Sequence, residues 1–180
     1  MKKKQGFGMW LSLIAIIAAV VAFVMYKQVL VDGEMLIIAS GSEFFYDPNA
    51  AYYATMVEAV APLTVVGVAL LALSILLGQI LNGYFGILTS LLRVVAPAVL
   101  MVAFLQFLYG SFTGLGWTYF SNEELEIYEK ALEVGQNVII TLGCFAGAAV
   151  LSMIAAFFKI SKKVAIKEKK AKKEAKKEAK

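Results

Sequence analysis

The side chains that could do chemistry are sparse, and most lie near the edges of long apolar runs. Charge is costly in hydrocarbon, so ionisable groups in such runs are functional candidates, and only Glu58 and Arg93 qualify. Three amides, Gln106, Gln136 and Asn137, fall near the predicted outer edge together with Glu58. These five residues could line a polar path or make structural hydrogen bonds. No charged pair falls at the middle of a run, where ion-coupled carriers usually keep one.

The residue inventory argues against several classes of enzyme. Histidine is absent from the 180 residues, which removes the usual general base, zinc ligand and haem ligand. The single cysteine, Cys144, can form no internal disulfide, and we expect it to pack as a small hydrophobe. No phosphate-binding, dinucleotide-binding or nucleophile-elbow motif occurs. We therefore expect no enzyme activity, no cofactor and no metal site.

The elements that must position these residues are transmembrane helices. The chain is 61% hydrophobic and 17% charged, against about 45–50% and about 25% in soluble domains. Four apolar runs reach the roughly 20 residues that cross a bilayer, namely 7–26, 57–81, 88–109 and 134–160. The predicted fold is an all-α integral membrane protein, a four-transmembrane-helix bundle. It forms a single domain over residues 1–160, with small extracytoplasmic loops and a basic tail at 161–180.

Two of the runs allow alternatives. The first follows Lys2–Lys4 like a signal peptide, but it is long and lacks a clean cleavage site, so we interpret it as an uncleaved anchor; cleavage would leave three spans. In the third apolar run, a transmembrane helix that began at Tyr84 would place Arg93 about 13 Å into the bilayer. A span from Leu91 would leave Arg93 snorkelling at the interface, and we favour that interpretation.

Lysine and arginine are distributed asymmetrically, which predicts the orientation. The segment from Lys27 to Glu58 has one lysine against five carboxylates, and residues 110–133 have one lysine against five glutamates. The tail from Lys159 has eleven lysines and three glutamates. Because positive residues accumulate on the cytoplasmic side, both termini should be cytoplasmic and both long loops outside the plasma membrane.

The first outer loop contains a hairpin signal. Two β-prone runs, 28–31 and 34–38, flank Asp32-Gly33, and such a turn favours a β-hairpin. The competing interpretation continues the first helix through Leu30. After this loop, Asp47-Pro48 predicts the start of a helix that leads into the second span.

The second outer loop combines aromatic residues with a helix signal. Residues 114–120 hold an aromatic cluster, and Ser121 with Glu124 forms a capping box. An amphipathic helix over 121–136 should follow, lying on the outer surface or extending the fourth span. The aromatic residues of both loops form an interface belt or a recognition surface for a partner.

Two further features concern association. Gly143 and Gly147 have the spacing that lets helices approach closely, which favours a compact bundle or a homo-oligomer. The lysine-rich tail predicts contact with anionic lipid. Its lysines lack interleaved aromatic residues, so no nucleic acid is expected.

These observations favour a small inner-membrane accessory, assembly or sensing subunit that engages a membrane-protein partner. The alternative is a small oligomeric transporter or channel with a path past Glu58 and Arg93. The layout of four spans with a larger first outer loop is similar to that of tetraspan proteins such as claudins. That similarity is one of topology, and the paired cysteines of claudins are absent, so it implies no function.

Overall fold

The protein is built from four long helices. The computed structural model describes residues 6–34, 51–80, 86–120, 125–158 and 160. The helices are α1 (Phe7–Glu34), α2 (Ala51–Ile80), α3 (Gly86–Phe120) and α4 (Leu125–Phe157). Each contains a segment long and apolar enough to cross a membrane. The predicted all-α fold with four candidate membrane spans is therefore confirmed.

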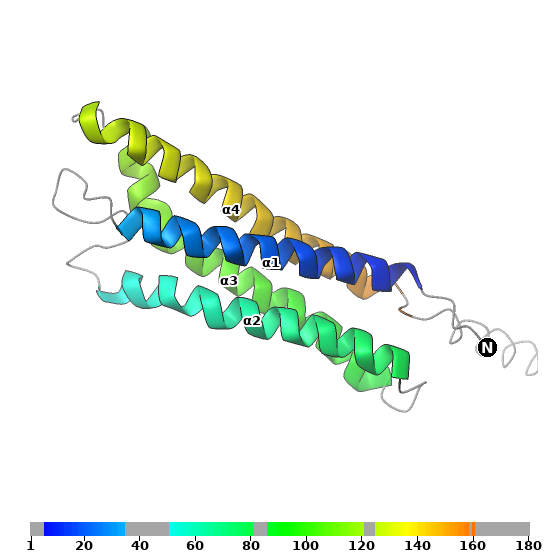
Figure 1. The fold of residues 1–180 in the computed structure, drawn as a ribbon. Coiled ribbons are helices and arrows are strands. Elements are labelled where there is room, and N and C mark those ends of the chain that lie inside the picture. The colour runs from blue at the N-terminus through cyan, green and yellow to red at the C-terminus, as the bar shows by residue number, and fades with distance from the viewer. Residues whose placement is uncertain (1–5, 35–50, 81–85, 121–124, 159, 161–180) are drawn as a thin grey trace, which may run out of the picture.

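The four helices form an up-and-down bundle with one loose seam (Figure 1). Helix α1 packs along α4, α4 along α3, and α3 along α2, whereas α1 and α2 touch much less. The start of α1 and the end of α4 lie together, because the Gly6 N–H donates to the Ile160 carbonyl oxygen at 2.7 Å. We call this end of the bundle the Arg93 end, and the opposite end, where α2 begins, the Glu58 end.

The interior of the bundle has two layers of side chains. Nearer the Glu58 end the Phe107 ring contacts Tyr26 edge-on, with ring centroids 5.4 Å apart, and lies 6.0 Å from the Phe145 ring. The layer nearer the Arg93 end consists mainly of alanines around two leucines. Small residues let helices approach closely in a membrane, and a Cβ added at Gly67 of α2 would lie 2.7 Å from Leu100 of α3.

The hydroxyl groups of the buried serines and threonines in the described helices are satisfied within their own helices. Each hydroxyl donates to a backbone carbonyl three or four residues earlier, so these hydrogen bonds do not link one helix to another. The residues are Ser12, Thr64, Ser74, Ser111, Thr118, Thr141 and Ser152. The centre of the bundle is therefore filled by apolar side chains, with hydroxyls that are already bonded.

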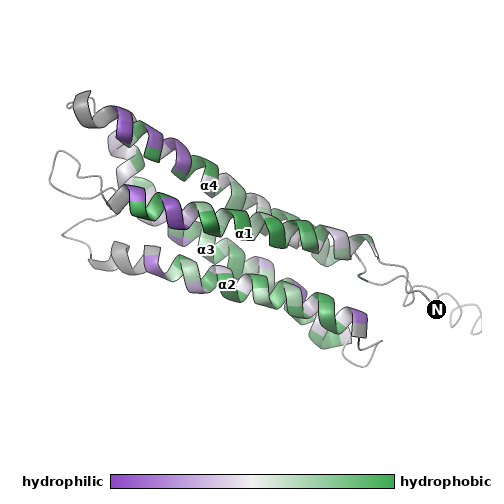
Figure 2. Ribbon diagram, in the orientation of Figure 1, coloured by the Kyte–Doolittle hydropathy of each residue, from purple (hydrophilic) through white to green (hydrophobic). Residues whose placement is uncertain are grey.

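Helices α3 and α4 are longer than a bilayer requires. They have 35 and 33 residues, so at 1.5 Å per residue each spans about 50 Å against roughly 30 Å of hydrocarbon. Figure 2 shows hydrophilic turns gathered on α4 near its start, at the Glu58 end. The hydrophilic start of α4 therefore lies at the Glu58 end (Figure 2), where Gly135 of α4 packs against Leu115, Thr118 and Tyr119 of α3.

The predicted β-hairpin in the first loop is wrong in its first half. Helix α1 continues through residues 28–31 and through Asp32-Gly33 to Glu34. Ala22, Tyr26 and Val29 are all buried, and their spacing of four and three residues continues the inward face of α1. A glycine in a helix costs only about 1 kcal/mol, too little to end a helix anchored by this packing. The second predicted strand lies, but for its first residue, outside the described residues.

The second outer loop also differs from its prediction. Residues 114–120 belong to α3, so the aromatic cluster lies on a helix and not on a loop. Helix α4 starts at Leu125 and runs without interruption into the fourth span, which confirms the extended-span alternative for the amphipathic segment. The capping pair Ser121 and Glu124 and the predicted helix start at Asp47-Pro48 lie outside the described residues.

Candidate functional site

Arg93 makes the most distinctive polar contacts in the described bundle. It lies two turns into α3, and its Nη2 donates to the carbonyl oxygens of Ala155 and Phe158, the latter at 2.5 Å. The last carbonyls of a helix are short of intrahelical donors, and the C-terminal end of a helix carries partial negative charge. The Ala155 carbonyl also accepts the Phe158 N–H at 3.1 Å, so Arg93 is its second donor. The Arg93 guanidinium therefore acts as a cationic cap for the end of α4, supplied by a neighbouring helix.

Helix α1 reaches the same point because it has a glycine there. A Cβ added at Gly8 would lie 2.3 Å from the Phe158 carbonyl oxygen and 3.0 Å from Arg93 Nη2. The neighbouring Phe7 and Phe158 rings meet edge-on at 5.1 Å. We call the group Gly8, Arg93, Ala155 and Phe158 the Arg93 clasp, since it holds α1, α3 and α4 together at one position.

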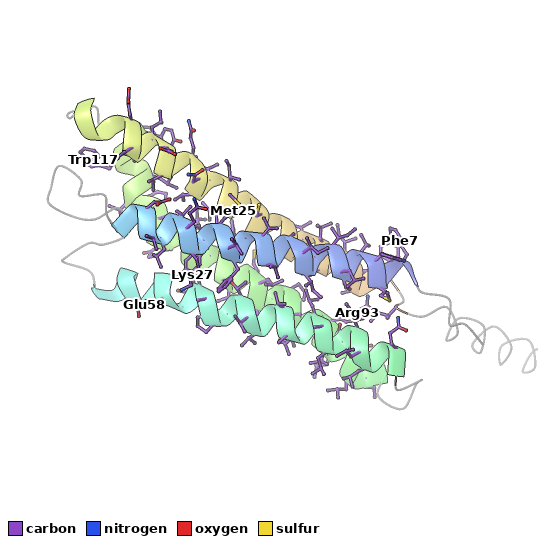
Figure 3. The ribbon with its side chains drawn as sticks, viewed as in Figure 1. Phe7, Met25, Lys27, Glu58, Arg93 and Trp117 are labelled. Atoms are coloured by element: carbon purple, nitrogen blue, oxygen red, sulfur yellow. The ribbon has the colours of Figure 1, made fainter. Side chains whose placement is uncertain are left out.

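Helix α2 joins the same end through a different contact. Gln79 Nε2 lies 2.7 Å from Met9 Sδ, to which it donates a hydrogen bond. The adjacent Gly78 faces Ile160, whose side chain would lie 3.1 Å from an added Cβ. All four helices are thus fastened at the Arg93 end, close to the place where α1 begins and α4 ends (Figure 3).

The Arg93 side chain bonds to protein carbonyls, and its predicted snorkelling at the interface stays a prediction. Its Nη2 group turns to the α4 carbonyls, and its Nε is buried without a hydrogen-bond partner among the described residues. Orphan carbonyls near hydrocarbon are strong acceptors, because water is scarce there. Helix α3 is continuous from Gly86 through Arg93 to Phe120, so the residues before Leu91 belong to the same helix.

The predicted polar residues do not gather at one place. Glu58 and Arg93 lie at opposite ends of the bundle (Figure 3). Gly135 faces Leu115, Thr118 and Tyr119 of α3, which places Gln136 and Asn137 more than two helical turns beyond Gln106. The five predicted residues are thus spread over the length of the described bundle. Whether they serve a polar path or structural hydrogen bonding stays a prediction.

Three of the predicted residues have environments that bear on association. The Gln106 Oε1 atom is buried and has no hydrogen-bond partner in the described part of the chain. Gly143 and Gly147 face away from the bundle, and a Cβ added at either would meet nothing within 4 Å. The two glycines therefore do not provide a close approach inside this bundle. Their use in packing against a further helix stays a prediction.

Sequence reasoning singled out Arg93 but missed its partners. Backbone carbonyls leave no mark in a sequence, so the Ala155 and Phe158 contacts could not be read from residue types. Gly8 carried a weak signal, as a glycine within the first turn of an apolar run. No sequence signal indicated the Gln79–Met9 hydrogen bond, because methionine commonly serves in helices as an apolar packing residue.

The helices and the clasp define a four-span helical membrane protein. Within the described ranges, no group of three or more histidine, cysteine, aspartate or glutamate residues could hold a metal ion. Comparison of the chain with protein families, curated proteins and solved structures finds no match.

Proposed function

We propose that this protein is an accessory subunit of a plasma-membrane assembly, and that it binds a partner membrane protein without catalysing a reaction. The proposed contact surface is the α3–α4 surface, defined as residues 114–120 of α3 and 129–137 of α4. Both termini would lie in the cytoplasm, as the lysine distribution indicates, with the lysine-rich tail against anionic lipid.

The hydrophilic start of α4, packed against the end of α3, is the observation that carries this proposal (Figure 2). On α4, Glu129, Lys130 and Glu133 are exposed, whereas Ala131 and Val134 are buried against the bundle. At the end of α3, Phe120 is 92% exposed. Two packed helix segments that present an exposed aromatic residue beside a charged face have the composition of a protein-binding surface.

The interior of the bundle supports a binding role over a transport role. Tyr26, Phe107 and Phe145 fill one layer, and Leu71 and Leu100 with several alanines fill the other. The hydroxyls of the buried serines and threonines in the described helices already donate to their own helices. A transport path through one copy of the chain would need polar groups that face a shared lumen, so the transporter alternative requires an assembly of several copies.

Affinity purification from native membranes in mild detergent tests the proposal. We expect a second membrane protein to co-purify at fixed stoichiometry with the full chain, and to be lost from the Phe120→Ser variant. Phe157, which is 85% exposed at the Arg93 end, supplies the matched control Phe157→Ser, which should keep the partner. Purified chain in proteoliposomes should add no solute or ion flux. Flux that depends on Glu58 or Arg93 would favour the transporter alternative instead.

A further inference from the structure

The seam between α1 and α2 contains a groove of about 270 Å³. It is open along one side and lies near the middle of both candidate spans. Among the described residues that line it, Thr64 alone has a polar side chain, and its hydroxyl donates to the Val60 carbonyl oxygen at 2.7 Å. The other lining residues are Ala19, Val20, Phe23, Val65, Val68 and Ala69.

The size and lining of this groove suit an acyl chain. A cavity of about 150 Å³ holds a benzene ring, so the groove has room for a length of alkyl chain. A helix with its side chains is about 10 Å or more across and would not fit inside it. Because the groove lies within the span and its described lining exposes no free polar group, the acyl chains of the surrounding lipid match its chemistry.

Two opposite charges stand above the groove at the Glu58 end. Lys27 is seven residues after Val20, and Glu58 is seven residues before Val65, so each charge lies two turns, roughly 10 Å, from the groove on the same helix face. Both side chains are exposed. Figure 3 shows Lys27 on α1 and Glu58 on α2 at the same end of the seam.

We propose that the α1–α2 seam binds one phospholipid of the phosphatidylethanolamine class. One acyl chain fills the groove, the Lys27 ammonium binds the phosphate, and the Glu58 carboxylate accepts hydrogen bonds from the head-group ammonium. The head group thus lies in the leaflet at the Glu58 end. A phosphate two turns above the groove sits where the hydrocarbon meets the head-group region, given the depth of the span.

This assignment predicts selectivity among lipid head groups. Phosphatidylglycerol offers the same phosphate but a neutral glycerol in place of the ammonium, so the negative charge of its phosphate stays uncompensated beside the Glu58 carboxylate. Phosphatidylcholine offers a quaternary ammonium, which cannot donate a hydrogen bond. Hydrogen bonds between charged groups are stronger than those between neutral groups. Phosphatidylethanolamine, whose primary ammonium can donate to Glu58, should therefore be retained in preference to phosphatidylglycerol and phosphatidylcholine.

Native mass spectrometry of the full chain tests the proposal. The protein is reconstituted in nanodiscs with equal amounts of the three lipids, carrying identical acyl chains, and then released in mild detergent. We expect one retained phosphatidylethanolamine, favoured about tenfold over each of the other lipids, which corresponds to one charge-assisted hydrogen bond. Lys27→Gln and Glu58→Gln should each abolish the preference, whereas Lys130→Gln and Glu133→Gln, exposed charges on α4, should leave it unchanged.

A second pair of variants tests the groove itself. Val65 is 58% exposed and lines the groove, so Val65→Trp should fill it and reduce lipid retention about tenfold, whereas Val150→Trp on α4, 48% exposed, should not. Equal retention in Val65→Trp and the wild type would overturn the proposal, as would a preference for phosphatidylglycerol. If the wild type forms a dimer and Val65→Trp abolishes that dimer, a second copy of the chain occupies the seam. That result would also overturn the lipid proposal.

Discussion

Arg93 of α3 donates a hydrogen bond to the carbonyl oxygen of Phe158, 2.5 Å away and just beyond the end of α4. The two residues are 65 positions apart in the sequence. Gly8 of α1 packs onto the same carbonyl with no room for a side chain. One backbone oxygen therefore lies against both α3 and α1, and the stability of the bundle should depend on it.

Removal of the guanidinium should destabilise the bundle. Arg93→Ala leaves the Ala155 and Phe158 carbonyls without their charged donor, and a hydrogen bond to a charged group contributes about 1.5–3 kcal/mol. We expect a clearly lower thermal unfolding midpoint in mild detergent, partly restored in Arg93→Lys. Ser90→Ala, one turn earlier on α3, removes only an exposed bond to the Gly86 carbonyl and serves as the control. Equal midpoints for Arg93→Ala and Ser90→Ala would contradict the clasp.

A methyl group at Gly8 should push α1 away from α4. The added Cβ would sit 2.3 Å from the Phe158 oxygen, so the backbone there must move. We expect Gly8→Ala to lower the thermal midpoint. Gly143→Ala is the matched control, because nothing lies within 4 Å of its added Cβ, and alanine is favoured over glycine in a helix by up to about 1 kcal/mol. A Gly8→Ala protein as stable as Gly143→Ala would show that the close approach does not exist.

The aromatic layer should couple three helices. Phe107 is fully buried between Tyr26 of α1 and Phe145 of α4, and truncation of a buried aromatic ring costs about 3–5 kcal/mol in soluble cores. We expect Phe107→Ala to destabilise the bundle markedly in detergent melting. Phe112→Ala, on a ring of the same helix that is 70% exposed, should cost little. Similar losses in the two variants would place Phe107 outside the interior.

The sequence predicts the helices of this protein well and the contacts between them poorly. Long apolar runs determine the four spans, since hydrocarbon leaves a single chain few alternatives to a helix. The Asp32-Gly33 pair predicted a turn because it reports only local backbone preference. The helix continues there because Tyr26 and Val29 pack into the bundle, and the sequence indicates this packing only through a weak helical periodicity of apolar residues. The clasp could not be predicted, because its acceptors are backbone carbonyls brought together by the fold.

The proposed orientation predicts which residues are reached from outside the cell. In a Cys144→Ser background, Lys130→Cys on the α3–α4 surface should react with a membrane-impermeant maleimide in intact cells. A cysteine placed in the lysine-rich tail, as Ala171→Cys, should react only after the membrane is opened. The measurement is the labelled fraction with and without permeabilisation. The reverse pattern would invert the topology and place the α3–α4 surface in the cytoplasm.

Site-specific photo-crosslinking in intact membranes tests the proposed accessory role most directly. Benzoylphenylalanine in place of Phe120 puts the reactive group on the α3–α4 surface, and in place of Phe157 it puts the group on a similarly exposed position at the Arg93 end. The account predicts a discrete adduct of the 19.6 kDa chain with one other membrane protein from position 120 and none from position 157. No adduct from position 120, or the same adducts from both positions, would contradict it.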